Sequence, residues 1–195
     1  MQDRIEMATD SIRISVEGLD AITRAMALAP DRAAKGVARA FTKASQFAVG
    51  RIASGLASDT RIPRRVFLEG KRIRQSASSD GSRKVWLGYN QMNARYAGRL
   101  QQFDWGAKAG PYLFPGAFLA PIPDAARPGI FRRVPNSWHR ATKGRYVGKL
   151  REKITPETVA LPTAPAVMRR VVAETEARLP VLLEQELHYS LWLAK

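Results

Sequence analysis

The chain has 195 residues, 45% of them hydrophobic, and its 32 lysines and arginines outnumber 17 acidic residues. This hydrophobic content excludes wholesale disorder, while the formal net charge of +15 favours an anionic partner, either nucleic acid or an acidic protein surface. With no cysteine and no apolar run of about 18 residues, disulfides, thiolate metal sites and a membrane span are excluded, and the N-terminal residues lack the apolar core of a signal peptide.

The chain begins with a predicted strand and a short helix. Apolar and polar residues alternate from 12 to 16, and this period of two is typical of a strand with one buried face. Gly18 interrupts the pattern. Residues 19–28 then predict a short helix that ends before Pro30.

A long amphipathic helix is expected next, because Pro30 and Asp31 supply a break and a capping carboxylate. It should continue to about Ala57. Its apolar residues recur at steps of three and four and form one stripe: Val37, Phe41, Ala44, Ala48, Ile52 and Leu56. The basic residues lie mostly off that stripe: Arg32, Lys35, Arg39, Lys43 and Arg51. This basic face is either solvated or turned towards DNA or an acidic subunit.

A basic segment and a hairpin follow the long helix. Residues 60–75 carry six cations against one acid. Pro63 could open a helical turn there and Gly70 could end it. Two strands are expected at 71–78 and 83–90, because the Asp-Gly pair at residues 80–81 suits a hairpin turn with positive φ.

The second half is predicted to hold strands, ordered loops and a final helix. Residues 91–146 are rich in glycine, proline and aromatic side chains, with the firmest strand at 129–134. The last helix should run from about 165 to 193, and Pro180 should kink or split it because proline lacks the backbone N–H. These elements predict one α+β domain over 1–195: a small antiparallel sheet packed by a long N-terminal helix, with a C-terminal helix.

Residue patterns typical of an active site are missing from the sequence. His139 and His188 do not share a metal-ligand spacing, and the acids near the C-terminus lie in a helix where they would be solvated. The segment 106–110 lacks the Gly-Lys-Ser/Thr ending of a phosphate-binding loop. We therefore expect no enzyme activity, no catalytic residue, no cofactor and no metal site.

Two basic clusters are candidates for contact with a partner subunit or with the DNA backbone. The residues of interest are Arg61, Arg64, Arg65, Arg72, Arg74, Arg132 and Arg133. Contacts of this type give affinity without sequence information and weaken as salt rises. Solubilising surface charge is the alternative interpretation for each arginine. Trp138 and Tyr146 lie beside the second cluster, where they could stack on bases or belong to the core or an interface.

Several short motifs, taken in order, carry a resemblance to a known family. The most specific are Phe114-Pro115-Gly116-Ala117-Phe118 and Ile130-Phe131-Arg132-Arg133, and residues 148–156 support them with an apolar-basic run that ends at Pro156. The basic segment from Thr60 and the Leu179-Pro180 pair agree in order. In this arrangement the chain resembles the minor tail protein Z family of tailed bacteriophages, also called tail completion proteins.

The resemblance implies a structural virion protein without catalytic activity. Copies would form a ring, expected to be hexameric, that completes the head-proximal end of the tail and connects it to the head-neck around the DNA channel. The implied partners are the tail terminator protein and the head-neck connector or portal-side proteins, and non-specific contact with genomic DNA is left open. Assembly would take place in the host cytoplasm. The alternative is a free basic protein that binds nucleic acid without sequence specificity.

Overall fold

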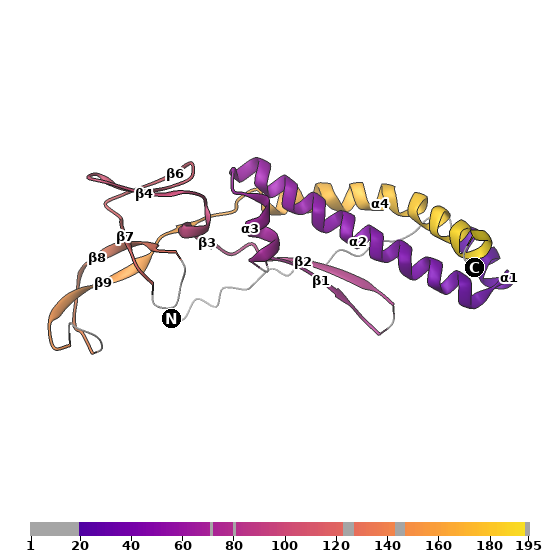
Figure 1. Cartoon of the computed structure of the whole chain (residues 1–195), viewed down its shortest axis with the longest axis horizontal. Helices are drawn as coiled ribbons and strands as arrows, with labels where there is room; N and C mark the ends of the chain where they lie inside the picture. The colour runs from indigo at the N-terminus through magenta and orange to yellow at the C-terminus, as the bar shows by residue number, and fades with distance from the viewer. Residues whose placement is uncertain (1–19, 71, 80, 123–126, 143–146, 194–195) are drawn as a thin grey trace. The chain divides into compact units, whose positions relative to one another are not determined.

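The computed structural model describes residues 20–70, 72–79, 81–122, 127–142 and 147–193, so the strand expected at 12–16 lies outside the described residues. The fold is α+β, with a long N-terminal helix, small antiparallel sheets and a C-terminal helix, as the sequence predicts (Figure 1). The chain divides into two compact units. We call residues up to 59, 64–89 and from 162 onwards the helical unit, and residues 60–63 and 90–161 the strand unit. The expectation of one domain stays a prediction.

The helical unit is built on two long helices that lie side by side (Figure 1). Its helices are α1 (Asp20–Leu28), α2 (Pro30–Thr60) and α4 (Ala164–His188), followed by a π-helical turn at Tyr189–Leu193. Helices α1 and α2 match their predicted ranges to within three residues. Most of the predicted α2 stripe is buried, and Ala40 and Ala44 pack against Leu179, Leu182 and Leu183 of α4.

Two glycines allow α2 and α4 to approach closely. A Cβ atom on Gly36 would lie 2.8 Å from Ser190 Oγ and 3.0 Å from the carbonyl oxygen of Glu186. A Cβ atom on Gly55 would lie 2.9 Å from Val167 Cγ1. The early part of α2 therefore meets the end of α4, and the late part of α2 meets its start, so the two helices run antiparallel. A side chain at either glycine would push them apart.

Pro180 does not split the last helix. Helix α4 continues across it from Ala164 to His188, so of the two predicted outcomes the split is wrong, and the kink stays a prediction. Leu179 and Leu182, on either side of the proline, are buried and hold both halves of α4 on α2. Pro180 itself is exposed, so the carbonyl that loses its helical partner can be hydrated instead.

A short helix and a hairpin complete the helical unit. Helix α3 (Arg64–Glu69) ends at Gly70, whose N–H donates to the carbonyl of Val66 at 3.1 Å. Strands β1 (Ile73–Ala77) and β2 (Arg83–Leu87) then pair antiparallel, and Gly81 takes the expected positive φ of 81° in their connection. Gln75 Nε2 of β1 donates to Ser45 Oγ of α2 at 2.8 Å, which ties the hairpin to the long helix.

The described residues of the strand unit form three small antiparallel sheets. The first pairs β3 (Met92–Asn93) with β10 (Thr158–Val159), and the 3-10 turn Ala94–Tyr96 follows β3. The second is a meander of β4 (Leu100–Phe103), β5 (Gly106–Ala109) and β6 (Tyr112–Pro115). The third contains β7 (Phe118–Ala120), β8 (Gly129–Arg140) and β9 (Leu150–Pro156). Strand β8 is six residues longer than the predicted strand, because its outer half pairs with β9.

Candidate interaction surfaces

The predicted arginines are shared between the two units. Arg64, Arg65, Arg72 and Arg74 belong to the helical unit, whereas Arg61, Arg132 and Arg133 belong to the strand unit. Arg64 and Arg65 are exposed on α3, and Arg61 is exposed directly after α2 with a φ of 55°. Within the helical unit, Arg72 is half-buried before β1, and the guanidinium of Arg74 lies 5.8 Å from the ring centre of its cross-strand neighbour Trp86.

Arg132 and Arg133 occupy opposite faces of β8, and each has a partner in the strand unit. Arg132 Nε donates to Glu157 Oε1 in an ion pair. The guanidinium of Arg133 lies 5.4 Å from the centre of the Phe118 ring on β7. These contacts hold both side chains in place, while both residues remain largely exposed. Although they are neighbours in sequence, the two side chains project from opposite faces of β8, so they cannot contact the same point on a partner.

The antiparallel pair β8–β9, which we call the ribbon, has two chemically different faces (Figure 1). Cross-strand partners project to the same face of a sheet and successive residues alternate. The register pairs Arg133 with Ile154, Trp138 with Glu152 and Arg140 with Leu150. These residues therefore share one face, which we call the apolar face after Trp138, Leu150 and Ile154.

The opposite face of the ribbon is basic. His139 pairs with Arg151 and Arg132 pairs with Thr155. Lys149 continues the same register, because its carbonyl accepts from the N–H of Ala141 at 3.0 Å. We call the set on this side the basic face: Arg132, His139, Lys149, Arg151 and Lys153.

A wide bulge connects the inner and outer halves of the ribbon. Residues 134–137 of β8 lie between the pairs made by Arg133 and Trp138, opposite Lys153 alone, and Asn136 takes a φ of 60°. Ser137 Oγ accepts from the N–H of Lys153 at 3.0 Å and donates to the carbonyl of Val134 at 2.5 Å. The Ser137 hydroxyl thus replaces ladder hydrogen bonds that the bulge removes, and bulges of this kind re-aim the strand beyond them.

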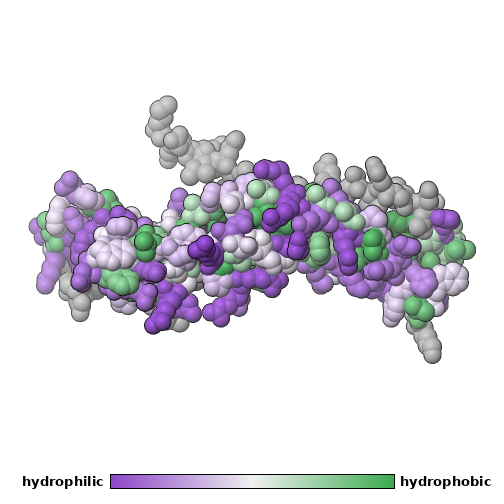
Figure 2. Space-filling model, turned by 90° about the horizontal axis from the view of Figure 1, so that it is seen from above, coloured by the Kyte–Doolittle hydropathy of each residue, from purple (hydrophilic) through white to green (hydrophobic). Residues whose placement is uncertain are grey.

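Three large side chains of the apolar face are open to solvent. Trp138 is 58% exposed, Leu150 61% and Ile154 48%. Figure 2 shows hydrophobic residues in small groups among hydrophilic ones on the side of the molecule in view. Exposed single apolar residues are common on proteins, but here three large ones share one face of a two-stranded ribbon, on either side of Glu152. Basic residues at 149, 151 and 153 alternate with Leu150, Glu152 and Ile154, and this period of two could have revealed both faces from sequence.

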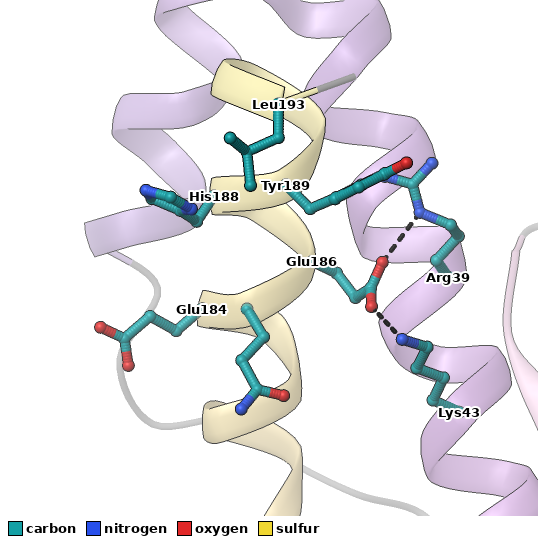
Figure 3. A pocket seen from close by; sticks show the side chains of 8 residues that line it. Arg39, Lys43, Glu184, Glu186, His188, Tyr189 and Leu193 are labelled. Atoms are coloured by element: carbon teal, nitrogen blue, oxygen red, sulfur yellow. Dashed lines mark hydrogen bonds and ion pairs between the residues drawn. The ribbon is translucent and has the colours of Figure 1, made fainter. Parts of the chain in front are cut away.

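An open depression of about 650 Å³ lies in the helical unit beside the end of α4 (Figure 3). Its lining includes Arg39, Lys43 and Glu186, and the Glu186 side chain is only 8% exposed. Arg39 Nε donates to Glu186 Oε2 at 2.8 Å, and Lys43 Nζ donates to the other carboxylate oxygen. Glu184 and His188, which also line the depression, point to the other side of α4 in Figure 3.

The two cations keep Glu186 ionised. The hydrogen bond from Lys43 holds the pKa of Glu186 below its usual range, with a further hydrogen bond from Arg39, although burial acts in the opposite direction. Both carboxylate oxygens are engaged, and Arg39 also donates to Ser190 Oγ and lies 5.1 Å from the Tyr189 ring centre. The cluster therefore joins α2 to α4 and offers no unpaired carboxylate for proton transfer.

A second ion pair links the same helices. Arg51 Nε and Nη2 of α2 donate to the two carboxylate oxygens of Glu174 on α4, at 2.6 and 3.0 Å. The hydrogen bond from Arg51 lowers the pKa of Glu174. Three of the five cations expected on the basic face of α2 thus have an acidic partner in the same chain. These are Arg39, Lys43 and Arg51, and each pairs with a glutamate of α4.

Two further observations concern only the part of the chain that the structure describes. Among those residues, no three His, Asp or Glu side chains gather as metal ligands would. No described helix is both long and apolar enough to span a bilayer. His139 is exposed on β8 of the strand unit and His188 is exposed at the end of α4 in the helical unit.

Comparison with known proteins adds no relative. No family model, no curated protein and no solved structure matches this chain.

Proposed function

We propose that this chain is a structural virion subunit of a tailed bacteriophage that completes the head-proximal end of the tail. Copies form a ring around the DNA channel and connect the tail to the head-neck, without catalysis. The resemblance to tail completion proteins motivates the proposal. Three of the segments that carry this resemblance are neighbours in the strand unit: residues 114–118 lead into β7, residues 130–133 lie on β8 and residues 150–156 form β9.

The exposed apolar face of the ribbon is the observation that carries the assembly part of the proposal. A two-stranded ribbon is marginal in water by itself, and its exposed Trp138, Leu150 and Ile154 gain stability when another surface covers them. Full burial of a large apolar side chain contributes about 1.5–3 kcal/mol. A second copy of the chain is the partner that a ring supplies, because each subunit of a closed ring contacts its neighbours through two different faces.

The exposed arginines have a role in the same proposal. Arg61, Arg64 and Arg65 are exposed, and cationic side chains at a rim steer association with acidic neighbours. In the ring they would dock the tail terminator or the head-neck proteins. Their positive charge also keeps subunits apart until a complementary surface is available.

The copy number of this chain in purified, nuclease-treated particles tests the proposal. Quantitative mass spectrometry should find one ring of copies in each particle, about six for a hexamer. Absence of the chain from finished particles would overturn the assignment. The free nucleic-acid-binding protein would then be the better account, because its charge would act outside the virion.

A further inference from the structure

The segment that contains the ribbon is one of concentrated positive charge in the sequence. Residues 129–156 contain eight lysines and arginines and one glutamate, so these 28 residues carry a net charge of +7. The single acid, Glu152, pairs with Trp138 and lies on the apolar face. Glu157, just beyond β9, is already engaged by Arg132. Of these cations, Arg133 and Arg140 lie on the apolar face. Arg132, Lys149, Arg151 and Lys153 lie on the basic face, to which the described strands β8 and β9 add no carboxylate.

We propose that the basic face of the ribbon binds duplex DNA along its phosphate backbone, without reading the sequence. Lys149, Arg151 and Lys153 project from every second position of one extended segment. Successive cations are thus about 6.7 Å apart along the strand. Cations in a row along one strand can each contact a phosphate of the DNA backbone. A two-stranded ribbon is also narrow enough to enter the major groove.

The division between the two faces favours a duplex over a single strand. Proteins that bind single strands combine cations with aromatic side chains on which bases stack. Here Trp138 lies on the apolar face, opposite the row formed by Lys149, Arg151 and Lys153. The basic face offers His139 as its one ring in the part of the ribbon that the structure describes. Phosphate contact, which a duplex presents on its outside, is the interaction that this face can make.

This inference goes beyond the proposed function and does not depend on it. DNA binding by the basic face is a property of each subunit, whereas the ring depends on the apolar face. In a ring the two properties would combine, because each copy would add one ribbon to the contact with DNA.

The inference is tested by measuring how tightly the full chain binds a labelled, random-sequence duplex. Fluorescence anisotropy gives the binding constant at several salt concentrations. The ribbon variant carries Lys149→Gln, Arg151→Gln and Lys153→Gln. A matched control carries Arg32→Gln, Lys35→Gln and Arg178→Gln, which remove the same charge from exposed positions of the helical unit. We expect the ribbon variant to bind at least roughly tenfold more weakly, and the slope of log K against log salt to fall by about 2–3.

The control separates contact from net charge. It should bind nearly as tightly as the original chain, with the same salt slope. Equal losses in both triple variants, or no loss in the ribbon variant, would overturn the inference. A variant with Lys149→Arg and Lys153→Arg keeps the charge and should bind like the original chain. Circular dichroism and thermal melting of each variant show whether it is folded.

Two other ligands, polyglutamate and single-stranded DNA, show which partner the ribbon binds if duplex DNA is not that partner. A ribbon variant that keeps its duplex affinity but loses binding to polyglutamate would point to an acidic protein surface instead. Tighter binding to a single strand, lost with Trp138→Ala, would place the contact on the apolar face. Native mass spectrometry of the ribbon variant should give the same oligomer as the original chain, so failure of DNA binding and failure of assembly are distinguishable.

Discussion

At the residue scale, the cluster around Glu186 shows how a buried carboxylate can serve structure alone. Its two oxygens accept from Arg39 and Lys43, which are 40% and 57% exposed. In both ion pairs the cationic side chain is therefore exposed to solvent, while the Glu186 carboxylate is buried. Such a pair contributes little by attraction alone, but removal of one partner leaves the remaining groups poorly satisfied.

Replacement Glu186→Gln should lower the free energy of unfolding at neutral pH by about 1–2 kcal/mol, because charged hydrogen bonds to Arg39 and Lys43 are lost. Urea denaturation measures the change. Glu184→Gln, on the exposed side of α4, is the matched control and should change stability little. Equal effects of the two substitutions would contradict the structural role of Glu186.

The same glutamate predicts an acid dependence of stability. The pKa of Glu186 in the folded chain lies below the ordinary glutamate value of 4.5, because Lys43 and Arg39 donate hydrogen bonds to its carboxylate. As the pH falls, the Glu186 carboxylate is therefore protonated in the unfolded chain before it is protonated in the folded chain. The stabilisation by ionised Glu186 is fully present above the unfolded pKa and is lost as the pH falls through the folded pKa. The loss of stability below about pH 5 should be smaller for Glu186→Gln. Identical acid profiles would rule this out.

Two glycines of α2 predict opposite effects of the same substitution. Gly36→Ala places its Cβ 3.0 Å from the backbone carbonyl of Glu186, which cannot move easily, whereas Gly50→Ala meets only Arg64 Nη2 at 3.5 Å. Alanine favours a helix over glycine by about 1 kcal/mol, and overpacking costs about 1–3 kcal/mol. Thermal melting should show a lower Tm for Gly36→Ala and a higher Tm for Gly50→Ala. A rise for both would show that α4 yields at Gly36.

At the element scale, the ribbon is the least self-sufficient part of the described fold. Its outer strands have no second layer of their own, since β8 beyond the bulge and β9 are mostly exposed. The helical unit is different, because α2 and α4 bury one another's apolar stripes. Local openings of a protein concentrate where few apolar contacts exist, so the ribbon should exchange its amide hydrogens faster than α2.

Substitution of the apolar face should abolish self-association without unfolding the chain. The variant carries Trp138→Ser, Leu150→Ser and Ile154→Thr, all at exposed positions. We expect native mass spectrometry to show an oligomer for the original chain and a monomer for the variant. Leu28→Ser, at a position that is 74% exposed on α1, is the control and should leave the oligomer intact. Persistence of the oligomer in the triple variant would assign assembly to another surface.

At the scale of the whole molecule, the net charge of +15 opposes the compact state. The ion pairs at Glu186 and Glu174 offset part of this repulsion inside the helical unit, and the pair between Arg132 and Glu157 does so in the strand unit. Salt screens repulsion between exposed charges over a distance of about 10 Å at 0.1 M.

Moderate sodium chloride should therefore raise the melting temperature of the chain. Lysines and arginines outnumber acidic residues 32 to 17. Screening should relieve the repulsion within this excess more than it weakens exposed ion pairs, which are worth little individually. Calorimetry between about 0.05 and 0.5 M salt measures the effect. A duplex should produce a larger rise than salt if it binds the folded chain, and a melting temperature that falls with salt would mean that the ion pairs dominate.

Much of the fold could be predicted from sequence because its signals are local. The ranges of α1 and α2 follow from capping residues and a three- and four-residue apolar period, and the β1–β2 hairpin follows from Asp-Gly between two alternating runs. The α+β class was determined in the same way. The split at Pro180 was wrongly predicted because the cost of a proline depends on what lies beside the helix, and two buried leucines hold α4 on α2 across it.

The candidate surfaces needed the tertiary structure. Sequence alone supplied the charge and the identity of Arg132 and Arg133, but two neighbouring arginines on a strand project to opposite faces, and only the register with β9 decides what accompanies each. The acidic partner of the cations on α2 lies more than 120 residues away in the chain. Periodicity and capping act between near neighbours, so sequence determined the elements, the fold class and the excess of charge. Pairing and burial join distant residues, so only the folded chain decided which charges are neutralised and which faces stay open.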